Sequence, residues 1–239
     1  MKKLLLSFSL LFVASTAILA QTVINDLNVE KRNVAGFHGI DVGTGIQLTL
    51  TNGNVEEIAV SAETTKFRDN IVTKVENGVL KIYYDNKTDA VNKKNERKNL
   101  KAYVSYKMLD QLEANTGASV DIDGVLTSAS LKIKANTGAR IKGKISSTDL
   151  KVEQNTGSQI SISGQTEKLE VEGDTGSKFD GADLVTNICN AKVSTGARIS
   201  VTANKELSAK ANTGGNVKYK GEPSVKEIKK NTGGSVSKI

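Results

Sequence analysis

A tripeptide, Asn-Thr-Gly or a close variant, recurs seven times in the second half of this 239-residue chain. Its threonines are separated by 21, 19, 19, 20, 18 and 19 residues. A constant period of this length is typical of repeat proteins, in which each repeat buries its apolar face only by stacking on its neighbours. The motif threonines are Thr116, Thr137, Thr156, Thr175, Thr195, Thr213 and Thr232.

Within each repeat, apolar and polar residues alternate with period two, which is the period of a β-strand. The position four residues before the threonine is apolar, and it holds Leu112, Ile133, Val152, Val171, Ala191, Ala209 and Ile228. The position that follows is charged, and it holds Glu113, Lys134, Glu153, Glu172, Lys192, Lys210 and Lys229. The pattern predicts two short strands per repeat and hence an all-β fold, a parallel β-helix or solenoid of about 20-residue coils.

The repeated tripeptide is interpreted as a structural corner between the two strands. Glycine permits a backbone with positive φ, asparagine can hydrogen-bond locally and along a stack, and threonine is small with high β propensity. The expected corner ladder consists of Asn115, Asn136, Asn155, Asp174, Ser194, Asn212 and Asn231, with Gly117, Gly138, Gly157, Gly176, Gly196, Gly214 and Gly233.

Four segments are expected along the chain. Residues 1–20 have two lysines, an apolar run and a final alanine, which is typical of a secretory signal peptide cleaved before Gln21. Residues 21–32 form a polar lead-in, residues 33–106 are rich in strands, and residues 107–239 form the solenoid with seven coils. The protein is therefore expected to be exported, to the periplasm, the outer cell surface or the extracellular space, with no transmembrane segment after cleavage.

The strand-rich part, residues 33–106, lacks the Asn-Thr-Gly motif. It contains alternating stretches such as "IQLTLT" and "VLKIYY", turns at "TNGN" and "ENG", and a short helix expected at Thr64–Asn70. The alternation does not distinguish an antiparallel capping domain from irregular solenoid coils. At the other end, Lys226 and Lys230 occupy positions that are apolar or small in most coils, so the last coil is expected to fray.

The order of "GFHGIDVGTGIQLTLTNGN", "VENGVLKIYY" and "YVSYKMLDQLEANTGASVDIDG" resembles the head GIN domain family, labelled putative auto-transporter adhesins. The resemblance covers about Asn33 to Ile239, and Gly45-Ile46-Gln47 stands where a Gly-Ile-Asn would match the family's name. It implies an exported protein with a right-handed β-helix-like fold. It carries no binding residue over to this chain.

Few residues are candidates for chemistry. His38 is the only histidine and Cys189 the only cysteine, so a zinc cluster is excluded, and Cys189 occupies a core leucine column. The pairs Asp121 with Asp123 and Asp180 with Asp183 are the nearest approach to paired carboxylates. No catalytic, cofactor or metal residue is expected.

The composition favours a binding protein over an enzyme. The formal charge is +7, but lysines and glutamates are mixed along the chain, and the basic stretch Asn92–Lys101 is interpreted as a polar loop. We expect a non-catalytic, exported adhesion-type module whose partner is a glycan, a cell-surface protein or an extracellular protein, and not nucleic acid. The alternative is a polysaccharide-active β-helix enzyme, a lyase or hydrolase. The ligand, its binding residues and the oligomeric state are left open.

Overall fold

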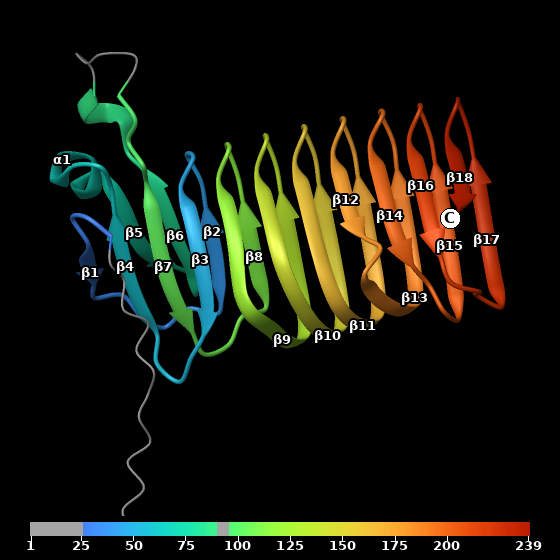
Figure 1. Ribbon diagram of the computed structural model, residues 1–239, viewed down its shortest axis with the longest axis horizontal. Helices are drawn as coiled ribbons and strands as arrows, with labels where there is room; N and C mark the ends of the chain where they lie inside the picture. Colours follow the sequence, from blue (N-terminus) through green and yellow to red (C-terminus); the bar gives the residue numbers. More distant parts are fainter. Residues whose placement is uncertain (1–25, 90–95) are drawn as a thin grey trace, which may run out of the picture.

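The computed structural model describes residues 26–89 and 96–239, and these residues form an elongated β-solenoid (Figure 1). One turn takes about 19 residues, which confirms the fold class and the period expected from the sequence. The expected signal peptide, residues 21–25 of the lead-in and part of the basic stretch lie outside the described residues. The strands are β1 (Glu30–Arg32), β2 (Gly39–Val42), β3 (Gln47–Asn52), β4 (Glu57–Ser61), β5 (Ile71–Glu76), β6 (Val79–Tyr84), β7 (Lys101–Tyr106), β8 (Gln111–Ala114), β9 (Ser119–Ala135), β10 (Arg140–Gln154), β11 (Gln159–Gly173), β12 (Lys178–Gly181), β13 (Leu184–Val193), β14 (Arg198–Thr202), β15 (Glu206–Ala211), β16 (Asn216–Lys220), β17 (Val225–Lys230) and β18 (Ser235–Lys238).

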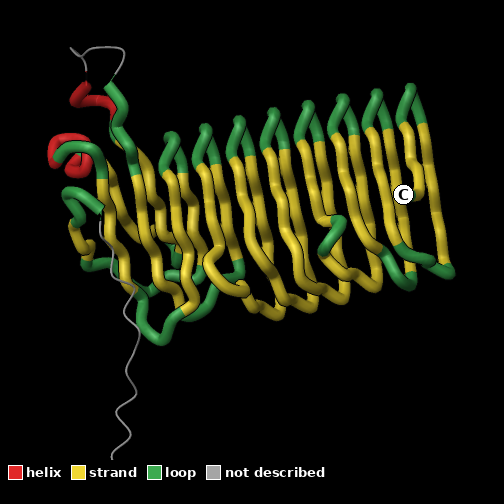
Figure 2. Tube along the Cα trace, in the orientation of Figure 1, coloured by secondary structure: helices red, strands yellow, loops and turns green. Residues whose placement is uncertain are grey.

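Each coil contributes one strand to each of two facing sheets, and the corners line up along one edge (Figure 2). The leading sheet contains the strands that run into the corners: β2, β8, the second halves of β9 to β11, β13, β15 and β17. The trailing sheet contains the strands that leave them: β3, the first halves of β9 to β11, β12, β14, β16 and β18. All of these pairings are parallel, and equivalent residues of successive coils lie beside one another.

The core is filled by the inward columns of the two sheets. Val152 pairs with Ile133 on one side and Val171 on the other, and all three are fully buried. Cys189 lies in the same sheet in the column of Leu169 and is 1% exposed, so it is part of the core as expected. Constant register keeps each apolar column inside, because a shift by one residue would turn it to solvent.

The solenoid starts earlier than the Asn-Thr-Gly motif does. β2 and β3 pair in parallel with β8 and β9, and the bend between them, Gly43-Thr44-Gly45, has the same backbone conformation as the seven motif corners. Sheet pairing thus continues across the boundary at residue 106, because β2 and β3 lie before it and their partners β8 and β9 lie after it. Part of the strand-rich segment is therefore an eighth coil whose corner has glycine in place of asparagine.

The rest of this segment closes the N-terminal end of the core with antiparallel strands. β4 pairs antiparallel with β7 and β1, and β5 pairs antiparallel with β6. The short helix α1 (Thr65–Asp69) lies where it was expected: the Thr64 hydroxyl accepts a hydrogen bond from the Phe67 N–H at 3.3 Å, and the Phe67 side chain is buried. A 3-10 helix, η1 (Asn86–Asp89), follows β6. Both alternatives for this segment are thus partly right.

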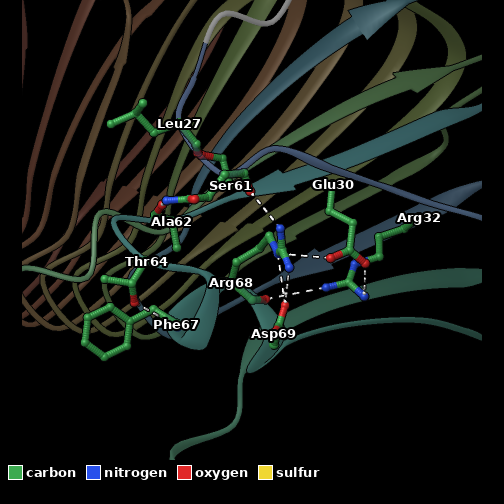
Figure 3. A network of polar contacts seen from close by, with 10 residues as sticks. Leu27, Glu30, Arg32, Ser61, Ala62, Thr64, Phe67, Arg68 and Asp69 are labelled. Atoms are coloured by element: carbon green, nitrogen blue, oxygen red, sulfur yellow. Dashed lines mark hydrogen bonds and ion pairs between the residues drawn. The ribbon is translucent and has the colours of Figure 1, made fainter.

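A polar network fastens β1 to the helix (Figure 3). The Glu30 carboxylate lies 2.9 Å from the guanidinium groups of both Arg32 and Arg68, and Arg68 also contacts Asp69 at 2.7 Å. Arg32 donates to the Arg68 carbonyl at 3.5 Å. Since the two arginines share one carboxylate and are largely covered, this network holds the lead-in strand against the cap.

The C-terminal end has no comparable cover among the described residues. β17 and β18 still pair in parallel with β15 and β16, but every residue of β17 is exposed. Lys226 and Lys230 stand beside Leu207 and Ala211 of the preceding coil. The last coil therefore keeps the fold without a filled interior, and its lysines protect an open sheet edge from pairing with another chain.

Candidate functional site

The eight corners share one backbone geometry, a two-residue turn with both central residues in the left-handed region. The threonine φ values lie between 45° and 57°, and those of the glycines that follow between 68° and 73°. In the first motif corner the Ala118 N–H donates to the Asn115 carbonyl at 3.0 Å, which closes the turn. This is a type I′ turn, the form that joins tightly turned strands.

The threonine was expected to contribute β propensity, and that expectation is wrong. Each threonine adopts positive φ, a conformation that is an outlier for a β-branched residue. Glycine at the next position has the role that was expected of it. The two residues together impose the reversal of the chain, and the threonine does so under strain.

The corners are connected by a ladder of backbone hydrogen bonds. The glycine N–H of each corner donates to the threonine carbonyl of the next coil, from Gly45 to Thr116 at 3.0 Å through to Gly214 to Thr232 at 3.1 Å. The ladder runs without interruption through all eight corners. Its rungs are main-chain groups, so it does not depend on the side chain at the first corner position.

The expected side-chain ladder is discontinuous. Asn136 donates to Asn115 at 3.1 Å, Ser194 to Asp174 at 2.8 Å, and Asn231 to Asn212 at 3.2 Å. Asn155 instead accepts a hydrogen bond from the N–H of its own neighbouring threonine at 2.7 Å. The side chain at the first corner position thus hydrogen-bonds within its own turn in some coils and to the neighbouring coil in others.

Asp174 is the one carboxylate at the first corner position. Hydrogen bonds from the Thr195 and Ser194 hydroxyls lower the pKa of this carboxyl, with a further contribution from the Thr175 N–H. The carboxylate therefore takes the acceptor role that an asparagine oxygen has elsewhere, and it is ionised at neutral pH.

A groove of about 450 Å³ lies on the leading sheet beside the corners. Its charged side chains form ion pairs between neighbouring coils: Lys134 lies 3.4 Å from Glu153, and Lys192 lies 2.7 Å from Glu172. Further ion pairs join neighbouring coils, among them Lys151 with Glu170 at 3.6 Å. The charges of this surface largely neutralise one another.

Below this groove, Gln154 points into the core, although the two adjacent coils have Ala135 and Gly173 at the equivalent position. With its amide oriented so that both ends are satisfied, it donates to the Lys178 carbonyl at 3.2 Å and accepts from the Phe179 N–H at 2.9 Å. It fits because the next coil has Gly173, where a Cβ would lie 3.4 Å from the amide nitrogen of Gln154. Gln154 thus joins the two sheets in the middle of the stack, a function that sequence analysis missed.

A second groove, of about 480 Å³, lies on the trailing sheet and crosses β3, β9, β10, β11 and β12. It runs along the solenoid axis, because it crosses adjacent strands. Short polar residues such as Ser119 and Ser161 form its floor between the longer Arg140, Lys142 and Lys178. Sequence analysis named no binding residue here. The alternation does show, however, that the residues three and five positions after each motif threonine point outward.

The candidates for catalysis are not brought together. The His38 ring lies 2.8 Å from the Asp110 carboxylate on the exposed surface of the cap. Asp121 is paired with Lys142 at 2.8 Å, and Asp183 lies 3.8 Å from Lys220. Burial raises the pKa of the Cys189 thiol to about 12, which keeps it protonated.

Two absences hold for the described part of the chain. No group of three or more histidine, cysteine, aspartate or glutamate side chains is placed to hold a metal ion. No helix in residues 26–89 and 96–239 is long and apolar enough to cross a membrane.

Solved structures share this architecture. The chain is similar to a putative adhesin from Bacteroides fragilis, with TM-score 0.77, 19% identity, and coverage of 88% of this chain and 96% of that one. A putative adhesin from Parabacteroides merdae gives TM-score 0.70 at 15% identity and covers 90% and 97%. A putative lipid binding protein from Parabacteroides distasonis gives 0.65 at 19% and covers 88% and 96%. At these identities the likeness shows the fold alone.

No curated protein matches the chain. A family model does: the one described as "Putative auto-transporter adhesin, head GIN domain" matches residues 36–223. The matched range contains the cap apart from β1, the eighth corner and all coils except the last. It also agrees with the resemblance found in the sequence. The chain therefore belongs to the head GIN domain family of auto-transporter adhesin-type proteins.

Proposed function

We propose that this protein is a non-catalytic, exported binding module of the adhesion type. Its partner is a glycan, a cell-surface protein or an extracellular protein, and contact is made along the long face of the solenoid. The observation that carries the proposal is the pair of grooves, each of which crosses five adjacent strands with side chains repeated from coil to coil.

Repetition at fixed spacing suits a ligand that is itself repetitive. Strands in a sheet lie ~4.8 Å apart, so five strands present equivalent side chains over ~19 Å. Each contact is exposed and individually weak, but contacts made together by one rigid surface add through effective concentration. A rigid sheet also requires little ordering when the ligand binds, which favours affinity.

The test is a glycan array and an extracellular-matrix protein panel, probed with the protein and run beside a polysaccharide depolymerisation assay on the same glycans. Binding without a change in polymer length is the expected result. Shortening of a polysaccharide by the protein would overturn the non-catalytic assignment and support the β-helix enzyme.

Export is part of the same proposal, and it rests on the family membership and on the pattern of residues 1–20. Fractionation of native cells followed by mass spectrometry is expected to find a chain that starts at or near Gln21 outside the cytosol. An intact Met1 start in the cytosolic fraction would contradict it.

A further inference from the structure

The two faces of the solenoid differ in how their charges are compensated. On the leading sheet, outward lysines form ion pairs with carboxylates of neighbouring coils. On the trailing sheet, the outward cations outnumber the carboxylates. The cations are Arg140, Lys142, Lys178, Arg198 and Lys218, and the carboxylates in the same two columns are Asp121 and Asp180.

Three of these cations form a row without internal partners. Arg140, Lys178 and Arg198 occupy equivalent positions on β10, β12 and β14, and all three side chains are exposed. Within the described residues none of the three has an ion pair, whereas Lys142 is neutralised by Asp121. Strands are ~4.8 Å apart, so Arg140 and Lys178, two strands apart, are separated by ~9.6 Å along the solenoid axis. Lys178 and Arg198 lie on adjacent strands and are separated by ~4.8 Å.

The residues between these cations are neutral hydrogen-bonding groups. Gln159 occupies the same column on β11, between Arg140 and Lys178, and Ser119 and Ser161 line the groove beside it. These groups suit hydroxyls, and the cations suit carboxylates. The groove therefore matches a polymer in which anionic groups alternate with many hydroxyls.

This chemistry favours an acidic polysaccharide over a nucleic acid. Single-stranded nucleic acids are held by aromatic side chains on which successive bases stack, beside a positively charged groove that follows the backbone. None of the side chains that line the trailing groove is aromatic, and Asp121 and Asp180 would repel a dense phosphate backbone but can accept hydrogen bonds from sugar hydroxyls.

We infer that an acidic polysaccharide binds along the solenoid axis, in the trailing groove and onward over β14, with its carboxylates on Arg140, Lys178 and Arg198. The inference rests on the proposed binding function and names its ligand class. The extended chain runs perpendicular to the strands, so successive sugars meet successive coils. A longer polymer gains contacts coil by coil, and its affinity rises with length.

The experiment measures binding of the protein to polygalacturonate, with dextran as the neutral polymer of similar size. The test variant carries Arg140→Gln, Lys178→Gln and Arg198→Gln. The control variant carries Lys107→Gln, Lys144→Gln and Lys168→Gln, which removes the same net charge from exposed positions that line neither groove. Circular dichroism melting of all three proteins verifies that they are folded.

The expected result is binding to polygalacturonate and not to dextran, weakened about tenfold or more in the test variant and by less than about threefold in the control. Added salt reduces the affinity of the wild-type protein more than that of the test variant, because exposed charges are screened.

Equal losses in the two variants would show a non-specific effect of net charge and overturn the inference. Tight binding to dextran or to a matrix protein that the test variant retains would also overturn it, while the proposed binding function would stand. If the glycan array and the protein panel show no binding at all, the proposed function fails, and the inference fails with it.

Discussion

Replacing a corner threonine by asparagine is expected to stabilise the protein. Thr156 has φ 49°, a conformation that costs an L-residue about 1–2 kcal/mol and a β-branched residue more than asparagine. Asparagine before glycine is also the preferred pair for a type I′ turn. The substitution Thr156→Asn therefore relieves strain at a position in the middle of the stack.

The magnitude follows from what the threonine side chain contributes. Thr156 is exposed, and among the described residues its hydroxyl makes no hydrogen bond, so little is lost with it. We expect the free energy of unfolding to rise by about 1 kcal/mol. Corners two or more coils apart lie ~9.6 Å or more from one another, so the triple variant Thr116→Asn, Thr156→Asn, Thr213→Asn is expected to gain about 3 kcal/mol by near-additivity.

A matched control is the same replacement on an extended strand. Thr127 is exposed on β9 and does not have positive φ. Thr127→Asn is expected to lower the free energy of unfolding by up to about 1 kcal/mol, because asparagine has the lower β propensity. The two replacements should thus change stability in opposite directions.

The assay is urea unfolding followed by circular dichroism, since the chain contains no tryptophan for fluorescence. Similar slopes with a shifted midpoint indicate a true change in stability. If Thr156→Asn leaves the midpoint unchanged or lowers it as Thr127→Asn does, positive φ at the corners carries no cost and the strain argument is rejected. A stabilised triple variant that binds its ligand less well would show that the threonines are retained for binding.

Three further predictions concern single positions. Val152→Asp places a charge in a fully buried column and should lower the free energy of unfolding by about 3–5 kcal/mol. Glu153→Lys, at the neighbouring outward position, should lower it far less. Both are measured as urea midpoints, and equal midpoints would refute the inward assignment of Val152. Gly164→Ala should lower the free energy of unfolding by about 3 kcal/mol, because the new Cβ would lie 2.1 Å from a carbonyl oxygen of the preceding coil. Gly157→Ala should lower it by about 1 kcal/mol from backbone strain alone, because no atom lies within 4 Å of its Cβ. Asp174 has a lowered pKa in the folded protein, so its contribution to stability is present above the unfolded pKa of about 4 and is lost as the pH falls through the folded value; Asp174→Asn should flatten the decline in melting temperature between about pH 4 and pH 2, and an unchanged profile would contradict this.

The solenoid core was predictable because one alternation is repeated in every coil. The columns of Val152 and Leu150 are inward in the structure as they are in the sequence pattern, and the strand period leaves no other arrangement once coils stack. The position of the corners was predictable for the same reason. The threonine conformation was not, because β propensity describes an average and the turn imposes its own dihedral angles.

Other features escaped because each depends on a departure from the repeat. The corner Gly43-Thr44-Gly45 has glycine where the motif has asparagine, and β6, which pairs antiparallel with β5, alternates like a solenoid strand does. Gln154 and Gly173 both differ from the alanine found at this repeat position in several other coils, and they place a large residue beside a small one in adjacent coils. This paired change is the sequence signal that would have revealed the link between the sheets. The cation row depends on which charges pair between coils, and the sequence pattern does not specify those pairs.

In-register stacking has a consequence for how such proteins change length. Because every coil presents the same hydrogen-bonding edges to both neighbours, removing residues 140–158, one period of 19, would join Ala139 to Gln159 with both still at their own positions in the turn. A duplication of the same segment would lengthen the solenoid equally well. The cross-section of the solenoid is therefore fixed by the sequence of one coil. The length of its face is set by the number of coils, which gene duplication or deletion changes by whole coils. Proteins built in this way can match polymers of different lengths without any change to the chemistry of a single contact.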